Sequence, residues 1–315
     1  MVFIEKRTAK EKTNFYFVKK LSFMGKRHSI KKLIGNSSNI SAEKYLLDNL
    51  EELSQKELEI RKAYLKNLQK ILSHNPSLPQ RVEFQAIKIN NLIEGKNCRS
   101  FILTEFAKEF IFNSNNIEGS KIPPERVREI IDKGDTKYKE RNEVLEVQNS
   151  IKAIEFLDKD FKFNIISIKR LYSILTNKLY RDGNQKYPKG FKKESNIVGN
   201  SSTTSPENVE KELKALLKWY KTNKKTSHPL VLAFEFHARY EQIHPFLDGN
   251  GRTGRLIMNK ILLNEGYFPI IVYKSNKLAY FNTLEKIEKT KNYYQFMLEQ
   301  ANKTYQFILE TVSRY

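Results

Sequence analysis

Residues 244–255 have the sequence HPFLDGNGRTGR, which combines one histidine, one carboxylate, a Gly-Asn-Gly turn and two arginines within twelve positions. Apolar residues follow directly at helical spacing: Leu256, Ile257, Ile261 and Leu262. This spacing predicts that the glycines form the turn in which a helix begins.

The glycine turn has the chemistry of a phosphate site. Gly249 and Gly251 let backbone N–H groups converge without obstruction by a Cβ, and the helix N-terminus adds partial positive charge. Arg252 and Arg255 are three positions apart, so both lie on one side of the first helical turns, where their guanidinium groups can reach phosphate oxygens. The stretch therefore predicts a polyphosphate site.

Two further residues add metal and acid–base chemistry. Asp248 precedes the turn and can hold a divalent cation that bridges phosphates, because Mg²⁺ prefers one or two carboxylates plus substrate oxygens. His244 has an imidazole that can take the proton of an attacking hydroxyl. Phe246, between them, is expected to anchor the loop in the core.

These twelve residues resemble the signature loop of the Fic (Fic/Doc) family, HxFx(D/E)GNGRxxR, and match every fixed position. The resemblance implies a protein adenylyltransferase, which transfers AMP from ATP to a Ser, Thr or Tyr hydroxyl of a target protein. The intact GNGR favours AMP transfer over the phosphate transfer of Doc-type loops. A Fic enzyme that uses another nucleotide donor remains an alternative.

The resemblance also implies a role for each residue of the loop. His244 is the base, Asp248 is the ligand of Mg²⁺ (or Mn²⁺), and the turn from Gly249 to Gly251 is the anion hole. The α- and β-phosphates are assigned to Asn250 and Arg252, and the γ-phosphate to Arg255.

A second stretch, ESNIVGNSSTTSPE at 194–207, predicts a hairpin or flap, because the β-prone pair Ile197 and Val198 is followed by Gly, Asn, Ser and Thr. It lies within the longer stretch GFKKESNIVGNSSTTSPENV at 190–209. It resembles the family's flap, which implies that Ile197, Val198 and Gly199 dock the target segment by strand pairing. Lys192 or Lys193 stands where many members have an arginine.

Downstream, the stretch KSNKLAYFNTLEKIEKTKNYYQFM at 274–297 resembles the closing helices of the family. The resemblance implies that Tyr280 contributes to the pocket for the nucleotide base. The alternative is an aromatic residue of the core.

SNNIEG, residues 114–119, lies at the end of an amphipathic helix expected over about 104–118. A carboxylate held near Arg255 would pair with its guanidinium and occupy the space that a γ-phosphate needs. The stretch resembles the family's inhibitory motif (S/T)xxxE(G/N), which implies an enzyme autoinhibited by Glu118, with Ser114 and Gly119 as the other motif positions. The alternative is an ordinary helix C-terminus with a glycine stop.

Some relatives use such a glutamate to activate water and remove AMP, so that reaction is a further alternative. Self-modification and a homodimer are also consistent with the resemblance. Dimer exchange, a partner or a metal ion could release the inhibition, and the sequence does not rank them.

The rest of the chain is expected to be mainly α, a Fic-type helical core with a β-hairpin flap. Residues 1–40 alternate with period two and predict a small antiparallel β-meander. Residues 41–98 predict a helical segment in which Ser41 caps the first helix. Residues 99–315 are expected to form the Fic core, including the catalytic loop.

The chain has 315 residues and a formal net charge of +20, which indicates attraction to polyanions. Residues 1–35 contain ten Lys or Arg residues and only two Glu, so a nucleic-acid-binding or regulatory role of this basic region is the main alternative function. No apolar run suits a membrane span or a secretory signal, so we expect a cytoplasmic protein without membrane contact.

Overall fold

The computed structural model describes residues 1–9, 12–36, 39–72, 75–135, 137, 141–181, 185–198, 201–285 and 290–315. The chain divides into two compact units. Unit 1 comprises Met1–Leu103, Lys225–His228 and Ala301–Tyr315, and unit 2 comprises Thr104–Lys224 and Pro229–Gln300. The sequence predicts three consecutive segments instead, because the return of the C-terminal residues to unit 1 has no local signal.

Unit 1 contains the predicted meander. Its strands β1 (Val2–Ala9), β2 (Lys12–Phe23) and β3 (Lys26–Gly35) form an antiparallel sheet in the order β1-β2-β3. The turn between β2 and β3 is Met24–Gly25, with φ of 48° and 75°. Positive φ at both turn residues is typical of the tight turns that match the twist of a hairpin.

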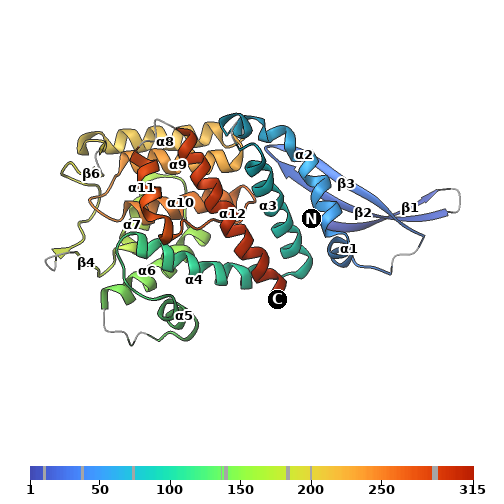
Figure 1. The fold of residues 1–315 in the computed structure, drawn as a ribbon, viewed down its shortest axis with the longest axis horizontal. Helices are drawn as coiled ribbons and strands as arrows, with labels where there is room; N and C mark the ends of the chain where they lie inside the picture. The colour runs from blue at the N-terminus through green and yellow to red at the C-terminus, as the bar shows by residue number, and fades with distance from the viewer. Residues whose placement is uncertain are drawn as a thin grey trace. The chain divides into compact units, whose positions relative to one another are not determined.

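Helices of unit 1 cover one face of this sheet (Figure 1). They are α1 (Ala42–Asp48) and α2 (Leu50–Ile71), and α3 (Ser77–Lys96) packs against both of them. The Ser41 hydroxyl accepts the backbone N–H of Lys44 at 3.1 Å, which confirms the predicted cap. Phe17 of β2 packs with Leu46 of α1 and Leu53 of α2, and all three are fully buried.

Unit 2 is mostly helical and carries two short strand pairs. Its helices are α4 (Arg99–Ile117), α5 (Pro124–Lys133), α6 (Arg141–Lys159), α7 (Ile165–Leu175), α8 (Val209–Asn223), α9 (Pro229–Ile243), α10 (Asn250–Asn264), α11 (Lys277–Glu285) and α12 (Thr290–Arg314), the first and last of which extend into unit 1 by residue number. The strand pairs are β4 (Tyr180–Arg181) with β5 (Gln185–Lys186), and β6 (Ile197–Val198) with β7 (Ser201–Ser202). The 3₁₀ turns are η2 (Pro206–Asn208) and η3 (Lys274–Asn276).

Helix α10 is at the centre of unit 2 and packs against α9, α7 and α6 (Figure 1). Most of its side chains are buried, including polar ones such as Arg252, Thr253 and Arg255. Buried polar groups of this kind need partners from neighbouring helices, so the site is built where these helices meet. Among the described residues, no helix is both long enough and apolar enough to cross a membrane.

Candidate active site

The loop between α9 and α10 is bounded by two residues with positive φ. His244 has φ 48°, and its backbone N–H donates to Tyr240 O at 2.9 Å. Gly249 has φ 78° and is the N-cap of α10. A non-glycine residue in this region is strained and persists only where its surroundings hold it. The predicted turn and helix start are confirmed.

The interior of the loop is braced by side chains. The Phe246 ring is fully buried and stacks on Tyr172 of α7, with 3.9 Å between the ring centroids. The Asn250 side chain binds both backbone groups of Phe246, accepting its N–H at 2.9 Å and donating to its O at 2.8 Å. Asn250 therefore holds the loop in shape, and its phosphate contact stays a prediction.

Arg252 extends from α10 toward α6 and the segment after β5. Its Nη1 donates to Glu146 Oε1 at 3.0 Å, and its Nη2 lies 3.4 Å from the Tyr187 hydroxyl. Burial raises the pKa of Glu146 although Arg252 opposes it. The sequence contains no local signal for this pair, because 106 positions separate its members.

Arg255 contacts the end of α4 and the turn after it. Its Nε donates to the Ser114 hydroxyl at 3.1 Å, and its Nη2 donates to Ser114 O at 2.9 Å and to Glu118 Oε1 at 2.7 Å. The Arg255 side chain is 1% exposed and that of Glu118 is 21% exposed. The structure thus brings together Ser114, Glu118 and Arg255.

Glu118 lies in the turn that follows α4. The helix covers Arg99–Ile117, so it begins earlier than expected, and Gly119 continues the turn with φ 111°. Burial acts to raise the pKa of Glu118, but the charges of Arg255 and Arg252 outweigh it and the pKa lies below its usual value. Glu118 is therefore an anion at neutral pH.

Gly251 is where the acid, the arginine and the glycine turn meet. A Cβ at this position would collide with Glu118 Oε1 and would lie 2.8 Å from Arg255 Nη1. Glu118 therefore packs directly against the backbone of the predicted anion hole. Among the described residues, Arg255 Nη1 and Arg252 Nε have no hydrogen-bond partner. These buried donors remain available to an anion at the N-terminus of α10.

His244 is 16% exposed, and its Nδ1 lies 3.9 Å from Glu241 Oε2, one helical turn earlier on α9. Burial, together with the positive charge of Lys192, lowers the pKa of His244 to about 4. Burial raises the pKa of Glu241 to about 8. Both groups are therefore neutral at pH 7, and a neutral imidazole is the form that can accept a proton.

Asp248 is the acidic residue of the loop, and 39% of its side chain is exposed. Its Oδ1 accepts the backbone N–H of Gly249, and its Oδ2 lies 3.8 Å from Arg181 Nε. No group of three or more His, Cys, Asp or Glu side chains within the described ranges could hold a metal ion unaided. A single carboxylate beside a phosphate turn nevertheless fits Mg²⁺, which takes its other ligands from phosphate and water.

The predicted flap is a hairpin, in which β6 pairs antiparallel with β7 and Ile197 is opposite Ser202. Gly199 lies outside the described residues. The base of the hairpin is attached to the catalytic loop: Asn196 Nδ2 donates to Phe246 O at 3.2 Å, and Thr204 N donates to Gln242 O at 3.2 Å. Docking of a target by Ile197, Val198 and Gly199 stays a prediction.

Tyr280 of α11 lies beneath Arg255, whose guanidinium carbon is 5.9 Å from the ring centroid. The residue is 1% exposed, and its hydroxyl forms a hydrogen bond with His237 Nε2 at 3.0 Å. In this structure the Tyr280 ring is within cation–π range of the buried Arg255 guanidinium. Its contact with a nucleotide base stays a prediction.

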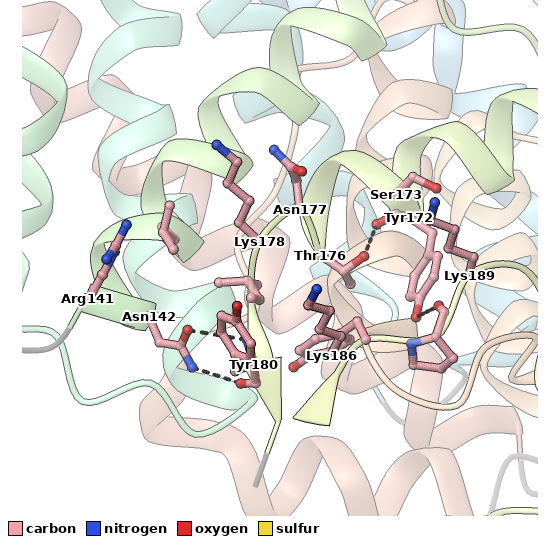
Figure 2. A pocket seen from close by; sticks show the side chains of 14 residues that line it. Arg141, Asn142, Tyr172, Ser173, Thr176, Asn177, Lys178, Tyr180, Lys186 and Lys189 are labelled. Carbon is pink, nitrogen blue, oxygen red and sulfur yellow. Dashed lines mark hydrogen bonds between the residues drawn. The ribbon is translucent and has the colours of Figure 1, made fainter. Parts of the chain in front are cut away.

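A pocket of about 960 Å³ lies beside the loop, between α6, α7 and the β4–β5 pair (Figure 2). Its cationic lining residues are Arg141, Lys178, Lys186 and Lys189, and none of the described residues that line it is acidic. Tyr172 and Tyr187 form its wall toward Phe246 and Arg252.

The walls of this pocket are held by hydrogen bonds. Asn142 binds both backbone groups of Tyr180, donating to its O at 2.8 Å and accepting its N–H at 3.3 Å (Figure 2). The Tyr172 hydroxyl donates to Pro188 O at 2.9 Å. This pocket has no local signal in the sequence, because its residues come from three separate segments.

Four further residues at the site were also missed: Glu146, Tyr187, Arg181 and Glu241. Glu241 had a local signal, since it precedes His244 by three positions and therefore shares a helix face with it. The other three had none, because only folding brings them to the loop.

Comparison with known proteins places the site in context. Residues 162–262 match the model of the Fic/DOC family. The chain is 25% identical over 229 residues to the protein named Protein adenylyltransferase Fic of Nematostella vectensis, a match that covers 70% of this chain and 52% of the relative. The chain spans about half, or less, of the length of the curated relatives it matches.

Solved structures share the fold. A Fic domain containing signaling protein from Bacteroides thetaiotaomicron aligns with a TM-score of 0.61 at 21% identity, over 69% of this chain and 91% of that chain. A Fic family protein from Desulfovibrio desulfuricans aligns with a TM-score of 0.59 at 24% identity, over 73% and 74% of the two chains. The match of residues 162–262 to the family model confirms the family resemblance. The solved structures confirm the mainly α fold that it implied.

Proposed function

We propose, from the premise that residues 162–262 form a Fic/DOC family domain, that the chain is a protein adenylyltransferase. It would transfer AMP from ATP to a Ser, Thr or Tyr hydroxyl of a target protein. One observation carries the proposal: Arg252 and Arg255, each with a buried nitrogen that has no hydrogen-bond partner, lie in the first turns of α10, directly after the loop that contains the neutral imidazole of His244.

In the proposed reaction the target hydroxyl attacks the α-phosphorus, and a new bond forms between that oxygen and phosphorus. The bond from the α-phosphorus to the oxygen shared with the β-phosphate breaks, and pyrophosphate leaves with the electron pair. The hydroxyl proton passes to His244, whose pKa of about 4 would rise beside the negative phosphates. The imidazolium then returns this proton to solvent.

The helix N-terminus and the two arginines supply the electrostatic part of the proposal. Backbone N–H groups at the first turn of α10 lack intrahelical partners and would stabilise the charge on the transferring phosphoryl group. Asp248 would hold Mg²⁺ (or Mn²⁺), which supplies charge neutralisation of the phosphates when bound. The guanidinium of Arg181, whose Nε lies 3.8 Å from Asp248 Oδ2, would have to move away from this carboxylate or contact it together with the metal ion.

We further propose that Glu118 inhibits the site in the state seen here. It occupies Arg255 Nη2 and lies against Gly251, so its negative charge is where a γ-phosphate would meet Arg255. Displacement of the turn at 118–119 would free the guanidinium for ATP. Release by dimer exchange, a partner or a metal ion, and self-modification, stay predictions, as does a cytoplasmic location.

The test compares transfer of label from α-³²P-ATP and γ-³²P-ATP to the protein itself and to a host lysate, with Mg²⁺. The wild type, Glu118→Gly, and Glu118→Gly combined with His244→Ala are assayed together. We expect label only from the α position, more of it in Glu118→Gly, and none in the double variant. Label from the γ position would contradict AMP transfer, and equal labelling by the wild type and Glu118→Gly would contradict the inhibition.

Two outcomes separate the alternative enzymes. Release of AMP from a modified target, lost in a Glu118 variant, would indicate AMP removal, in which Glu118 activates water. Transfer from another nucleoside triphosphate in place of ATP would indicate a different donor, because the phosphate contacts described above do not read the base.

Contact with nucleic acid by the basic sheet is the second candidate function. On the face of the sheet opposite α1, Lys20 Nζ lies 5.2 Å from the Phe3 ring centroid and Lys31 Nζ lies 4.3 Å from that of Tyr16. These cations cover the rings and so disfavour base stacking on them, but Lys31 is itself paired with Glu5 at 2.6 Å. Phosphate contact would therefore rest on the exposed Lys20 and Arg27. Salt-dependent binding of single-stranded nucleic acid that Lys20→Glu with Arg27→Glu abolishes would support it. Deletion of residues 1–40 is unsuitable, because it removes Phe17 and Ile30 from the core.

A further inference from the structure

Lys192 is a buried lysine whose hydrogen-bond partners are all neutral. The residue is 4% exposed, and its Nζ donates to Asn196 Oδ1 at 2.7 Å, to Thr203 Oγ1 at 2.6 Å and to Ile243 O at 3.4 Å. Within the described part of the chain, no carboxylate forms an ion pair with it. Burial of a lysine ammonium without a carboxylate partner is unfavourable, so its presence here calls for a functional reason.

The three acceptors belong to two different parts of the site. Asn196 and Thr203 lie at the base of the β6–β7 hairpin, and Ile243 is the last residue of α9. The backbone N–H of Lys192 also donates to Pro245 O at 3.0 Å. Lys192 therefore ties both sides of the hairpin to the residues that flank His244.

The charge of Lys192 also acts on His244. Apart from burial, it is the largest influence that lowers the pKa of this imidazole. The other charged groups that face His244 are Glu118 after α4 and Asp248 before α10, and both act to raise its pKa. Glu241 on α9 is nearest, but burial raises its own pKa to about 8 and leaves it neutral at pH 7.

We propose that Lys192 is a positioning residue, which holds the flap hairpin on the catalytic loop and places a positive charge beside the base His244. The inference rests on the proposed function, because His244 is a base only in a transfer reaction. The proposal links target docking to proton transfer. Lys192 holds the hairpin that would dock the target, and its positive charge acts on the imidazole that would accept the proton of the target hydroxyl.

Chemistry distinguishes lysine from arginine at this position. Three neutral oxygens arranged around one nitrogen suit an ammonium, whereas a guanidinium would need a planar, forked arrangement. Burial also lowers the pKa of Lys192 to about 8, so its charge declines in mildly alkaline solution, and an arginine would keep its charge there.

The experiment uses Lys192→Met, Lys192→Gln and Lys192→Arg, with Lys193→Met as the matched control, because Lys193 is adjacent and exposed. The first readout is NMR titration of the His244 imidazole, with the signal assigned by His244→Asn. It needs no substrate, so it stands even if AMP transfer fails. We expect the His244 pKa to rise by about one unit in Lys192→Met and Lys192→Gln, and to change little in Lys192→Arg and Lys193→Met.

The second readout is the pH profile of AMP transfer in the Glu118→Gly background. We expect the acid limb to move upward by the same amount in the two neutral variants. KM for the target should rise most in Lys192→Met, which makes none of the hydrogen bonds that hold the hairpin, and should also rise in Lys192→Arg, whose guanidinium does not suit the three acceptors. Lys192→Gln keeps hydrogen-bonding capacity, so it reports on charge if Lys192→Met fails to fold. An unshifted His244 titration in the neutral variants would overturn the proposal. A shifted titration without any transfer would refute the proposed function alone.

Discussion

Arg255 Nη2 lies 2.7 Å from Glu118 Oε1, although 137 positions separate the two residues along the chain. Two more hydrogen bonds from Arg255 to Ser114 anchor the same turn. Because Glu118 also lies against Gly251, this pair joins the end of α4 to the first turn of α10. The guanidinium that should meet a phosphate is thus partly engaged by the protein itself.

Glu118→Gln should increase the affinity for ATP by about tenfold, because it keeps the size of the side chain and removes the charge that competes for Arg255. Isothermal titration calorimetry of the wild type and the variant measures this. Glu125→Gln, an exposed residue of α5, is the control and should bind ATP like the wild type. Equal affinities for the wild type and Glu118→Gln would show that the carboxylate does not compete with ATP.

Arg255→Lys should be a severe change despite conserving the charge. A lysine ammonium cannot keep the separate Nε and Nη2 contacts to Ser114 and at the same time meet a γ-phosphate, as a guanidinium can. In the Glu118→Gly background we expect AMP transfer to fall by about 10- to 100-fold, consistent with loss of a charged hydrogen bond of about 1.5–3 kcal/mol. Initial rates at saturating target measure the effect. A lysine variant with full activity would mean that only charge matters at this position.

Gly254→Ala should lower the free energy of unfolding by about 1–3 kcal/mol, because its Cβ would collide with Glu241 Oε1 and lie 3.0 Å from Tyr240 Cδ1. Tyr240 is fully buried and cannot move aside, and the Glu241 carboxylate, 11% exposed, would have to rotate out of its place. The clash therefore outweighs the gain of about 0.5–1 kcal/mol that alanine normally brings inside a helix. Urea denaturation measures the change. Combination with Glu241→Ala should recover part of the loss, and a stabilised Gly254→Ala would contradict the close packing.

His244→Asn should reduce the amount by which the free energy of unfolding falls as the pH decreases. The pKa of His244 is lowered to about 4 in the folded chain, so between that value and about pH 6.5 the unfolded chain binds a proton that the folded chain does not. The wild type therefore loses up to about 1.4 kcal/mol per pH unit from this residue as the pH falls through that window.

Urea denaturation of both proteins at several pH values measures the difference, in which contributions of other groups such as Glu241 cancel. We expect the stability of the wild type relative to His244→Asn to decline as the pH decreases from 6.5 to 4. Parallel curves would indicate that His244 titrates normally in the folded protein.

Local features of this protein were predictable from the sequence. The turn at Gly249, the start of α10, the Ser41 cap and the β6–β7 pair all follow from residues within a few positions of each other. Backbone preference and side-chain periodicity act over this range. For the same reason, the order His, Asp, Gly-Asn-Gly, Arg, Arg was sufficient to point to a phosphate site.

Tertiary structure alone decided which groups surround that loop. Arg252 meets Glu146 and Arg255 meets Glu118 across more than 100 positions, and Lys192 reaches Ile243 across 51. The sequence determines that these charges exist and which helix faces they occupy. Their pairing depends on how α4, α6 and α10 pack, and burial then shifts the pKa values of His244, Glu241 and Lys192. Desolvation of this kind arises only when distant segments exclude water together, and no local pattern encodes it.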